Sequence, residues 1–400
     1  MNMQVNHLKS QAYLDSPWVS LFFKLLSAIE YGSITLVTPD GQSLQFAGDK
    51  SGSHPQIRIN DWGFCEKLFM RGDIGLGESY IDGDWDSEGI HALIRFGIEN
   101  KSCLERLIKG NILRIFFYRL KHLFNRNTKS GSERNIHAHY DLGNDFYSLW
   151  LDKSMTYSSA LFDKSEDLAS AQTRKYERIF ETLNLKNGDH VLEVGCGWGG
   201  FMEYAATRGV HITGVTISKE QFDFASKRLV DFENANVKYC DYRNLDGKYD
   251  YIVSIEMFEA LGYEYWKTYF NKLAGLLKDG GKIAIQSITI NDDDFKSYKR
   301  GTDFIQQYIF PGGLLSASKE FQRVSSVCGL KLVDEFRFGK DYGKTLDFWD
   351  KLFVQKIDDV KKLGFDEKFI RTWRFYFKYC QGGFEAQKIG VSQFLLEKAE

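Results

Sequence analysis

Residues 191–200 read Val-Leu-Glu-Val-Gly-Cys-Gly-Trp-Gly-Gly, an apolar run that leads into a series of glycines. Glycine lets the backbone turn sharply and approach another molecule closely. The amides of such a turn, together with the start of a following helix, would face that molecule. The stretch therefore predicts a strand, a glycine turn and a helix, with a ligand at the turn.

The residues on both sides of this stretch alternate between short apolar runs and helical segments. Strands are predicted at 190–194, 211–215, 237–240, 251–255 and 282–290. Helices are predicted between them, at 170–185, 199–208, 219–232 and 263–278. This alternation predicts an α/β fold with a doubly wound parallel sheet, in which ligands bind at the carboxyl ends of the strands. After residue 340 the pattern predicts aromatic-rich helices and no strand.

The glycine spacing differs from the dinucleotide pattern G-x-G-x-x-G. It has the E/D-x-G-x-G-x-G form that methyltransferases use for S-adenosylmethionine, with Glu193 near the amino end of that ligand. The second strand of such enzymes usually ends in an acid for the ribose, and here Thr216 and Gln221 would replace it. Asp241 and Tyr242, after the third strand, would flank the adenine. We therefore expect a Rossmann-like class I methyltransferase domain.

The chain divides into three predicted parts. Residues 1–103 predict a small α+β domain for docking or lipid binding, with strands at 33–37 and 43–46 and a turn-rich stretch at 72–84. Residues 104–135 predict a basic amphipathic helix and a linker. Such a helix lies either in a phospholipid interface or against the core of the protein. Residues 136–400 predict the methyltransferase domain with C-terminal acyl-binding helices.

The bulk composition narrows the choice of partners. A formal net charge of −2 gives no reason to expect a nucleic acid. No signal peptide is evident and no apolar run reaches about 18 residues, so we expect a cytoplasmic protein that meets lipid from the water side. The six cysteines lack the spacing of a metal site or a disulfide framework, and no metal is expected.

Several further motifs occur in order along the chain. They are HYDLGN at 139–144, MTYS at 155–158, MFE at 257–259, YIFPGG at 308–313 and FGKDYGKTL at 338–346. With the glycine turn, they make the chain resemble the cyclopropane-fatty-acyl-phospholipid synthase family, related to mycolic acid cyclopropane synthases, over about residues 30–395. The resemblance implies S-adenosylmethionine and a membrane phospholipid as substrates. It implies cofactor contacts from Tyr157, Ser158, Gly195, Gly197, Thr216, Gln221 and Tyr242.

The chemistry of such a family requires control of a cation. An alkene that attacks the sulfonium methyl group leaves a carbocation, which aromatic faces stabilise by up to ~2 kcal/mol per ring. The aromatic candidates are Tyr308, Phe310, Tyr342, Phe348 and Trp349. Ring closure also needs a base, which the resemblance implies to be a bicarbonate ion held by a cysteine, a glutamate, a histidine, a tyrosine and backbone groups.

The chain departs from that pattern at two positions. Glu259 and Tyr342 match the glutamate and the tyrosine, but Ser159 stands for the cysteine and Gln286 for the histidine, with Ile288 two residues on. Serine and glutamine donate hydrogen bonds without supplying charge. Two outcomes stay open. Bicarbonate binds through neutral donors and the product is a cyclopropane, or the anion is absent and Glu259 or water takes a proton to leave a methyl-branched alkene.

The predicted function is transfer of a methyl(ene) carbon to the cis double bond of an unsaturated phospholipid acyl chain at the inner membrane surface. A methyltransferase for a small polar acceptor and a non-catalytic lipid-binding protein are the rival hypotheses. The sequence leaves open a homodimer and, for a methyl-branched product, a partner reductase.

Overall fold

The computed structural model describes residues 16–103, 142–164 and 167–399. The predicted basic helix and linker at 104–135 lie outside these residues. Contacts between residues divide the chain into an N-terminal unit (1–137, 303–309 and 364–386) and a larger unit (138–302, 310–363 and 387–400). Two segments of the predicted C-terminal domain therefore belong to the N-terminal unit. The roles predicted for the three parts stay predictions.

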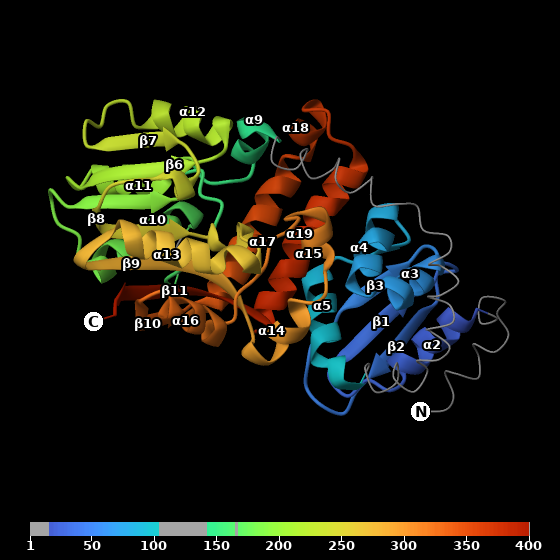
Figure 1. The fold of residues 1–400 in the computed structure, drawn as a ribbon. Helices are drawn as coiled ribbons and strands as arrows, with labels where there is room; N and C mark the ends of the chain where they lie inside the picture. Colours follow the sequence, from blue (N-terminus) through green and yellow to red (C-terminus); the bar gives the residue numbers. More distant parts are fainter. Residues whose placement is uncertain (1–15, 104–141, 165–166, 400) are drawn as a thin grey trace. The chain divides into compact units, whose positions relative to one another are not determined.

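The larger unit is built on a seven-stranded sheet in the order β10-β11-β9-β8-β5-β6-β7 (Figure 1). Its strands are β5 (His190–Val194), β6 (His211–Thr216), β7 (Ala235–Tyr239), β8 (Tyr249–Ile255), β9 (Leu277–Ile290), β10 (Leu330–Arg337) and β11 (Ile389–Lys398). Strands β5 to β9 pair in parallel, as predicted. The chain runs from β5 to β6 and β7 and then returns to β8 on the other side of β5. Ligands bind at such a reversal, outside the carboxyl ends of the strands.

Strand β11 shows that the prediction of no strand after residue 340 is wrong. It lies between β9 and β10 and is antiparallel to both. Its residues 391–396 are all buried, including Ser392 and Gln393. A strand buried on both faces shows no alternation of polar and apolar residues. The sequence pattern therefore carried no strand signal there.

Helices cover both faces of this sheet. The four predicted helices are confirmed as α10 (Leu168–Leu183), α11 (Gly200–Ala206), α12 (Lys219–Arg228) and α13 (Trp266–Leu276). Ile179 and Phe201 bring α10 and α11 into one core cluster with strand residues, and Phe270 and Phe321 bring α13 and α16 (Ser318–Val327) into a second cluster. Two such clusters are expected of a doubly wound sheet. The unit also contains α9 (Gly143–Ser148), α14 (Asp292–Tyr298), α17 (Gly339–Gln355) and α18 (Ile357–Lys362).

The N-terminal unit combines helices with a four-stranded sheet in the order β2-β1-β3-β4 (Figure 1). Its strands are β1 (Ser33–Val37), β2 (Ser43–Ala47), β3 (Gln56–Ile59) and β4 (Trp85–Asp86). Its helices are α2 (Pro17–Leu26), α3 (Gly63–Arg71), α4 (Asp73–Asp82), α5 (Ile90–Glu99), α15 (Phe304–Tyr308) and α19 (Glu367–Glu385). The two predicted strands are confirmed as the antiparallel pair β1 and β2.

Residues 72–84 are mainly helical, so the prediction of a turn-rich stretch is wrong there. Helices α3 and α4 meet at Gly72, which has a φ of 63°. A Cβ atom at Gly75 would lie 1.9 Å from the carbonyl oxygen of Lys67. Glycine thus permits a close approach of two helices here, and its presence alone does not distinguish this use from a turn.

Candidate active site

The glycine turn follows β5 at the point where the strand order reverses. Gly195, with a φ of 80°, and Gly197, with a φ of 51°, adopt the left-handed conformation that glycine favours. A Cβ atom at Gly195 would lie 2.6 Å from the Met257 side chain, whereas no residue that the structure describes lies within 4 Å of a Cβ atom at Gly197. The turn is therefore closed beside Met257 and open at Gly197, where a ligand can reach the backbone.

Glu193 is buried in β5, two residues before the turn. Its Oε2 atom is buried and has no hydrogen-bond partner among the residues that the structure describes. Burial raises the pKa of Glu193 well above its usual value, and the nearby charge of Lys175 opposes this rise. A buried carboxylate oxygen needs a partner, and the ammonium group of S-adenosylmethionine would supply one.

The next two strands of the sheet end in the polar residues predicted for the ribose and the adenine. The Thr216 hydroxyl, at the end of β6, donates a 2.8 Å hydrogen bond to Oε1 of Gln221. Beyond β7, the Asp241 carboxylate forms a 2.6 Å ion pair with Arg243, and Tyr242 follows it in a short helical turn. The structure thus places all four predicted residues after neighbouring strands, although the carboxylate of Asp241 is already engaged by Arg243.

Tyr157 lies in an aromatic cluster. Its ring centroid lies 5.3–6.2 Å from those of Tyr147, Trp150, Phe310 and Trp349. The Tyr342 ring meets Trp349 edge-on at 6.1 Å. Three of the five aromatic candidates for stabilising a cation, Phe310, Tyr342 and Trp349, are therefore brought together.

The other two aromatic candidates have different neighbours. Phe348 stacks on Phe162, with ring centroids 5.6 Å apart. Tyr308 belongs to the N-terminal unit, where its ring stacks on Phe304 and its hydroxyl hydrogen-bonds Glu78. A stabilising role for these two residues stays a prediction without support from their contacts.

Ser158 contacts a buried lysine that the sequence reasoning missed. Lys175, on α10, is fully buried and donates a 2.6 Å hydrogen bond from Nζ to the Ser158 hydroxyl. Burial lowers the pKa of Lys175 to about 7, and the charges of Glu256, Asp152 and Glu193 oppose this shift. The only signal in the sequence was a lysine on the apolar face of a helix, which is unusual for a charged side chain.

Glu256, directly after β8, connects most of the predicted catalytic residues. Its Oε1 atom accepts hydrogen bonds from the Ser159 amide at 2.9 Å and from Nε2 of Gln286 at 2.8 Å. Its Oε2 atom accepts a 2.7 Å bond from the Tyr342 hydroxyl. The sequence analysis named Glu259 as the catalytic glutamate because Glu259 matched the family motif, and it did not single out Glu256.

The side-chain amide of Gln286 is engaged at both ends. Its Nε2 group donates to Glu256 and, at 3.4 Å, to the Ser159 carbonyl, while its Oε1 atom accepts a 3.0 Å bond from Gln393 on β11. The carboxylate of Glu256 accepts only, which fixes the orientation of the amide. The Ser159 hydroxyl donates to the Ala160 carbonyl at 3.0 Å. Both predicted neutral donors are therefore already used by protein groups.

Glu259 lies three residues beyond Glu256 in a short helical turn. Its Oε1 atom accepts a hydrogen bond from the backbone amide of Ile288, so Ile288 takes part through its main chain. Its Oε2 atom is buried and has no hydrogen-bond partner in the described part of the chain. Burial and the charge of Glu256 raise the pKa of Glu259.

Glu256 and Glu259 differ in how readily their carboxyl groups ionise. Burial also raises the pKa of Glu256, but Lys175 and the three hydrogen bonds to Glu256 oppose that rise. Glu259 accepts one backbone hydrogen bond from β9 and faces the charge of Glu256. When two nearby acids compete, the group with more donors ionises first. We therefore expect Glu256 to be ionised and Glu259 to be protonated at neutral pH.

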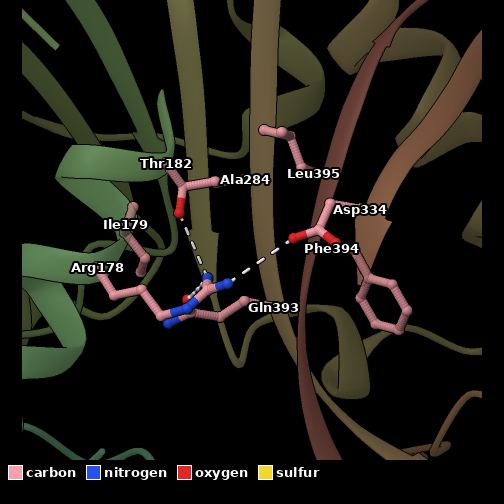
Figure 2. Close-up of a pocket in the computed structure, with 8 residues that line it drawn as sticks. All are labelled: Arg178, Ile179, Thr182, Ala284, Asp334, Gln393, Phe394 and Leu395. Atoms are coloured by element: carbon pink, nitrogen blue, oxygen red, sulfur yellow. Dashed lines mark hydrogen bonds and ion pairs between the residues drawn. The ribbon is translucent and has the colours of Figure 1, made fainter. Parts of the chain in front are cut away.

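A chain of hydrogen bonds continues from Gln286 to a small pocket between α10 and the sheet. Figure 2 shows Arg178 of α10 pointing across this pocket toward Gln393 and Asp334. The Arg178 guanidinium donates a 2.7 Å bond to Oε1 of Gln393 and lies 3.8 Å from a carboxylate oxygen of Asp334. Arg178 of α10 therefore holds Gln393 of β11, and Gln393 in turn orients the Gln286 amide.

A doubly wound sheet of this order, with a glycine turn after β5 and polar residues after β6 and β7, defines a class I S-adenosylmethionine-dependent methyltransferase. The chain belongs to the mycolic acid cyclopropane synthetase family, because the model of that family matches residues 127–394. The family and the cofactor that the motifs implied are thereby confirmed.

Two relatives span most of the chain. Tuberculostearic acid methyltransferase UfaA1 of Mycobacterium tuberculosis is 37% identical over 346 residues, which cover 83% of this chain and 80% of that protein. Cyclopropane-fatty-acyl-phospholipid synthase of Escherichia coli is 35% identical over 354 residues, which cover 87% of this chain and 89% of that protein. The two names refer to different products.

Among solved structures, mycolic acid cyclopropane synthase CmaA1 complexed with SAH and CTAB has a TM-score of 0.61 and 31% identity, and covers 66% of this chain and 98% of its own. The cyclopropane synthase MmaA2 from Mycobacterium tuberculosis has a TM-score of 0.62 and 27% identity over the same shares. SAH is the product that S-adenosylmethionine leaves after methyl transfer, which agrees with the cofactor assigned to this chain.

Proposed function

We propose that this chain transfers a methyl carbon from S-adenosylmethionine to the cis double bond of an unsaturated acyl chain in a phospholipid. The observation that carries the proposal is the junction between the aromatic cluster and two carboxyl groups. Tyr342 packs on Trp349 and hydrogen-bonds Glu256. A site for an alkene needs both parts, since it must first stabilise a cation and then remove a proton.

S-adenosylmethionine supplies an electrophilic methyl group on a sulfonium centre. The electron pair of the alkene forms the new carbon–carbon bond, the carbon–sulfur bond breaks, and a carbocation remains on the acyl chain. The faces of Tyr157, Phe310 and Trp349 lie together and would stabilise that cation by about 1–2 kcal/mol per ring in a dry site.

Two products follow from the same cation. In ring closure, the first candidate, the electron pair of a methyl C–H bond closes a cyclopropane as the proton leaves. In the second candidate, a hydride shifts along the chain and the same proton loss leaves an exomethylene group, which a partner reductase could saturate. The second is supported by Ser159 and Gln286, because the resemblance ties ring closure to a bicarbonate ion at these positions and their donors are already used within the protein.

Labelled S-adenosylmethionine and vesicles of unsaturated phospholipid test the proposal. We expect the label in the acyl chain, with a mass gain of one methylene in either product. Catalytic hydrogenation then separates the two, because an exomethylene group is reduced under mild conditions and the cyclopropane ring is more resistant. Label that enters small amines and not lipid would overturn the proposal in favour of a small-molecule methyltransferase.

The setting of the reaction is a further part of the proposal. Among the residues that the structure describes, no helix is long and apolar enough to cross a membrane. We propose that the protein works in the cytoplasm at the inner membrane surface and docks through the basic residues of segment 104–128. A homodimer and a partner reductase are compatible with the proposal and are not needed for methyl transfer.

A further inference from the structure

We propose that the carboxylate of Glu256 is the base that removes the proton after methyl transfer, in the place where the resemblance predicts a bicarbonate ion. The inference rests on the proposed function and identifies the proton acceptor of that reaction. It assigns a catalytic role to a residue that matches no part of the expected bicarbonate site.

The hydrogen bonds of Glu256 carry the inference. Positions 159, 286 and 342 are three of those that the resemblance predicts around bicarbonate. Donors at all three point to Glu256, namely the Ser159 amide, the Gln286 side chain and the Tyr342 hydroxyl. Bicarbonate and a glutamate side chain present the same planar pair of oxygens. The protein therefore carries, attached to its own backbone, the anion that these donors would otherwise recruit.

A second anion would be poorly placed in the same site. The donors are occupied, and the carboxyl group of Glu259 adjoins Glu256 closely enough for the charge of Glu256 to act on it. Like charges at such a distance oppose each other strongly in a buried site. Glu259 accepts a hydrogen bond from the Ile288 amide and acts as a positioning residue beside the base.

The backbone at Glu256 is also unusual. Its φ of 51° lies in the left-handed region, which few non-glycine residues adopt. Residues in such conformations persist when surrounding contacts hold them, and they concentrate at functional sites. Here three hydrogen bonds to the carboxylate hold the residue. A glycine at this position would adopt the same backbone without strain and without a carboxylate.

The proton balance is simple. A C–H bond of the transferred methyl group breaks, its electron pair forms the ring bond or the new double bond, and the proton passes to Glu256. Oε2 of Glu256 accepts one hydrogen bond, from Tyr342, and a carboxylate oxygen has room for another partner. A proton next to a carbocation is strongly acidic, so a weak base suffices. Glu256 later releases the proton to water, which leaves the net reaction balanced.

The test compares the wild-type protein with Glu256→Gly and Glu256→Gln in buffer freed of carbon dioxide. We expect the wild-type rate of lipid alkylation to stay unchanged when bicarbonate is removed. Both variants should lose roughly 10²-fold to 10⁴-fold in rate, the range of general-base contributions. Added bicarbonate or formate should restore part of the activity of Glu256→Gly, which opens the site. It should not restore Glu256→Gln, whose amide still fills the site.

A binding measurement gives a second readout that does not depend on turnover. ¹³C-labelled bicarbonate should show NMR line broadening with Glu256→Gly and none with the wild-type protein. Affinity for S-adenosylmethionine and thermal unfolding report whether each variant is folded. Glu233→Gln, at an exposed position, is the matched control and should behave as the wild type.

The outcomes separate this inference from the proposed function. A wild-type enzyme that stops without bicarbonate, or a Glu256→Gln variant with full activity, would overturn the role of Glu256 alone. A wild-type protein that alkylates no unsaturated lipid under any condition would overturn the proposed function, and the inference with it.

Discussion

Glu193, Glu256 and Glu259 lie at the carboxyl ends of neighbouring strands, yet their surroundings differ. Among the residues that the structure describes, Oε2 of Glu193 is buried without a hydrogen-bond partner, Glu256 accepts three hydrogen bonds, and Glu259 accepts one from the Ile288 amide. The charge of Lys175 opposes the rise in pKa of both Glu193 and Glu256. The neighbouring donors and cations thus determine whether each acid is charged, because a buried carboxylate needs them to compensate its lost hydration.

Replacement of Glu193 by glutamine tests the predicted ammonium contact. The change removes the charge and keeps the shape, so we expect affinity for S-adenosylmethionine to fall tenfold to a hundredfold, about 1.5–3 kcal/mol for a hydrogen bond to a charged group. Isothermal titration calorimetry measures it, with Glu233→Gln as the control. A dissociation constant within twofold of the wild-type value would show that Glu193 does not bind the ammonium group.

The pH dependence of stability tests the buried Lys175. Its pKa is lowered to about 7 in the folded protein, against 10.5 as the ordinary value. Between these two values the unfolded state binds the extra proton, so the free energy of unfolding rises with pH. Lys175→Met lacks this titration. We therefore expect the free energy of unfolding of the wild type, minus that of Lys175→Met, to rise by up to ~1.4 kcal/mol per pH unit above about pH 7.

Urea unfolding at pH 7, 8 and 9 measures this difference. The raised pKa of Glu259 makes the free energy of unfolding fall with pH, but it does so in both proteins and therefore cancels. Lys227→Met, at an exposed position on α12, should show no such trend. If the difference between the wild type and Lys175→Met stayed flat across this range, Lys175 would have an ordinary pKa.

At the scale of elements, the parallel strands and the antiparallel edge differ in how far the sequence predicts them. Strands β5 to β9 alternate with helices along the chain, and that alternation is visible in the sequence. Strand β11 returns from a long helical region and pairs with β9, which places Gln393 opposite Gln286. This pairing orients an amide in the site, and nothing local in either segment specifies it.

Helices α3 and α4 offer a test of their close approach. Gly75→Ala would place a Cβ atom 1.9 Å from the carbonyl oxygen of Lys67, so we expect a loss of about 1–3 kcal/mol, as for overpacking. Gly97→Ala in α5 is the matched control, since nothing in the described part of the chain lies within 4 Å of its Cβ position and alanine should stabilise that helix by up to ~1 kcal/mol. Chemical denaturation measures both variants. Equal changes in the free energy of unfolding for the two variants would contradict the close approach of α3 and α4 at Gly75.

At the scale of the whole molecule, the net charge of −2 hides an uneven distribution. Segment 104–128 has six basic residues, among them Arg114, Arg119, Lys121 and Arg126, and no acidic residue after Glu105. Basic residues near an anionic bilayer contribute about 1 kcal/mol each. If this segment docks the protein, its charge matters more than the charge of the whole.

Vesicle sedimentation tests that docking. Replacing Arg114, Arg119, Lys121 and Arg126, four of the six basic residues, by glutamine should weaken binding to anionic vesicles by up to ~4 kcal/mol and reduce its dependence on salt. Four exposed lysines replaced elsewhere serve as the control. Unchanged binding of the segment variant would favour the alternative, a helix packed on the core.

The sequence alone predicts the α/β class, the five parallel strands, the glycine turn and the family, because each depends on local periodicity or on residues close together in the chain. Only the folded structure shows which acid collects the hydrogen-bond donors. Glu256 receives its donors from residues 159, 286 and 342, and Lys175 lies on yet another helix. The charge of a buried group depends on all the atoms around it, and only folding brings these four segments together.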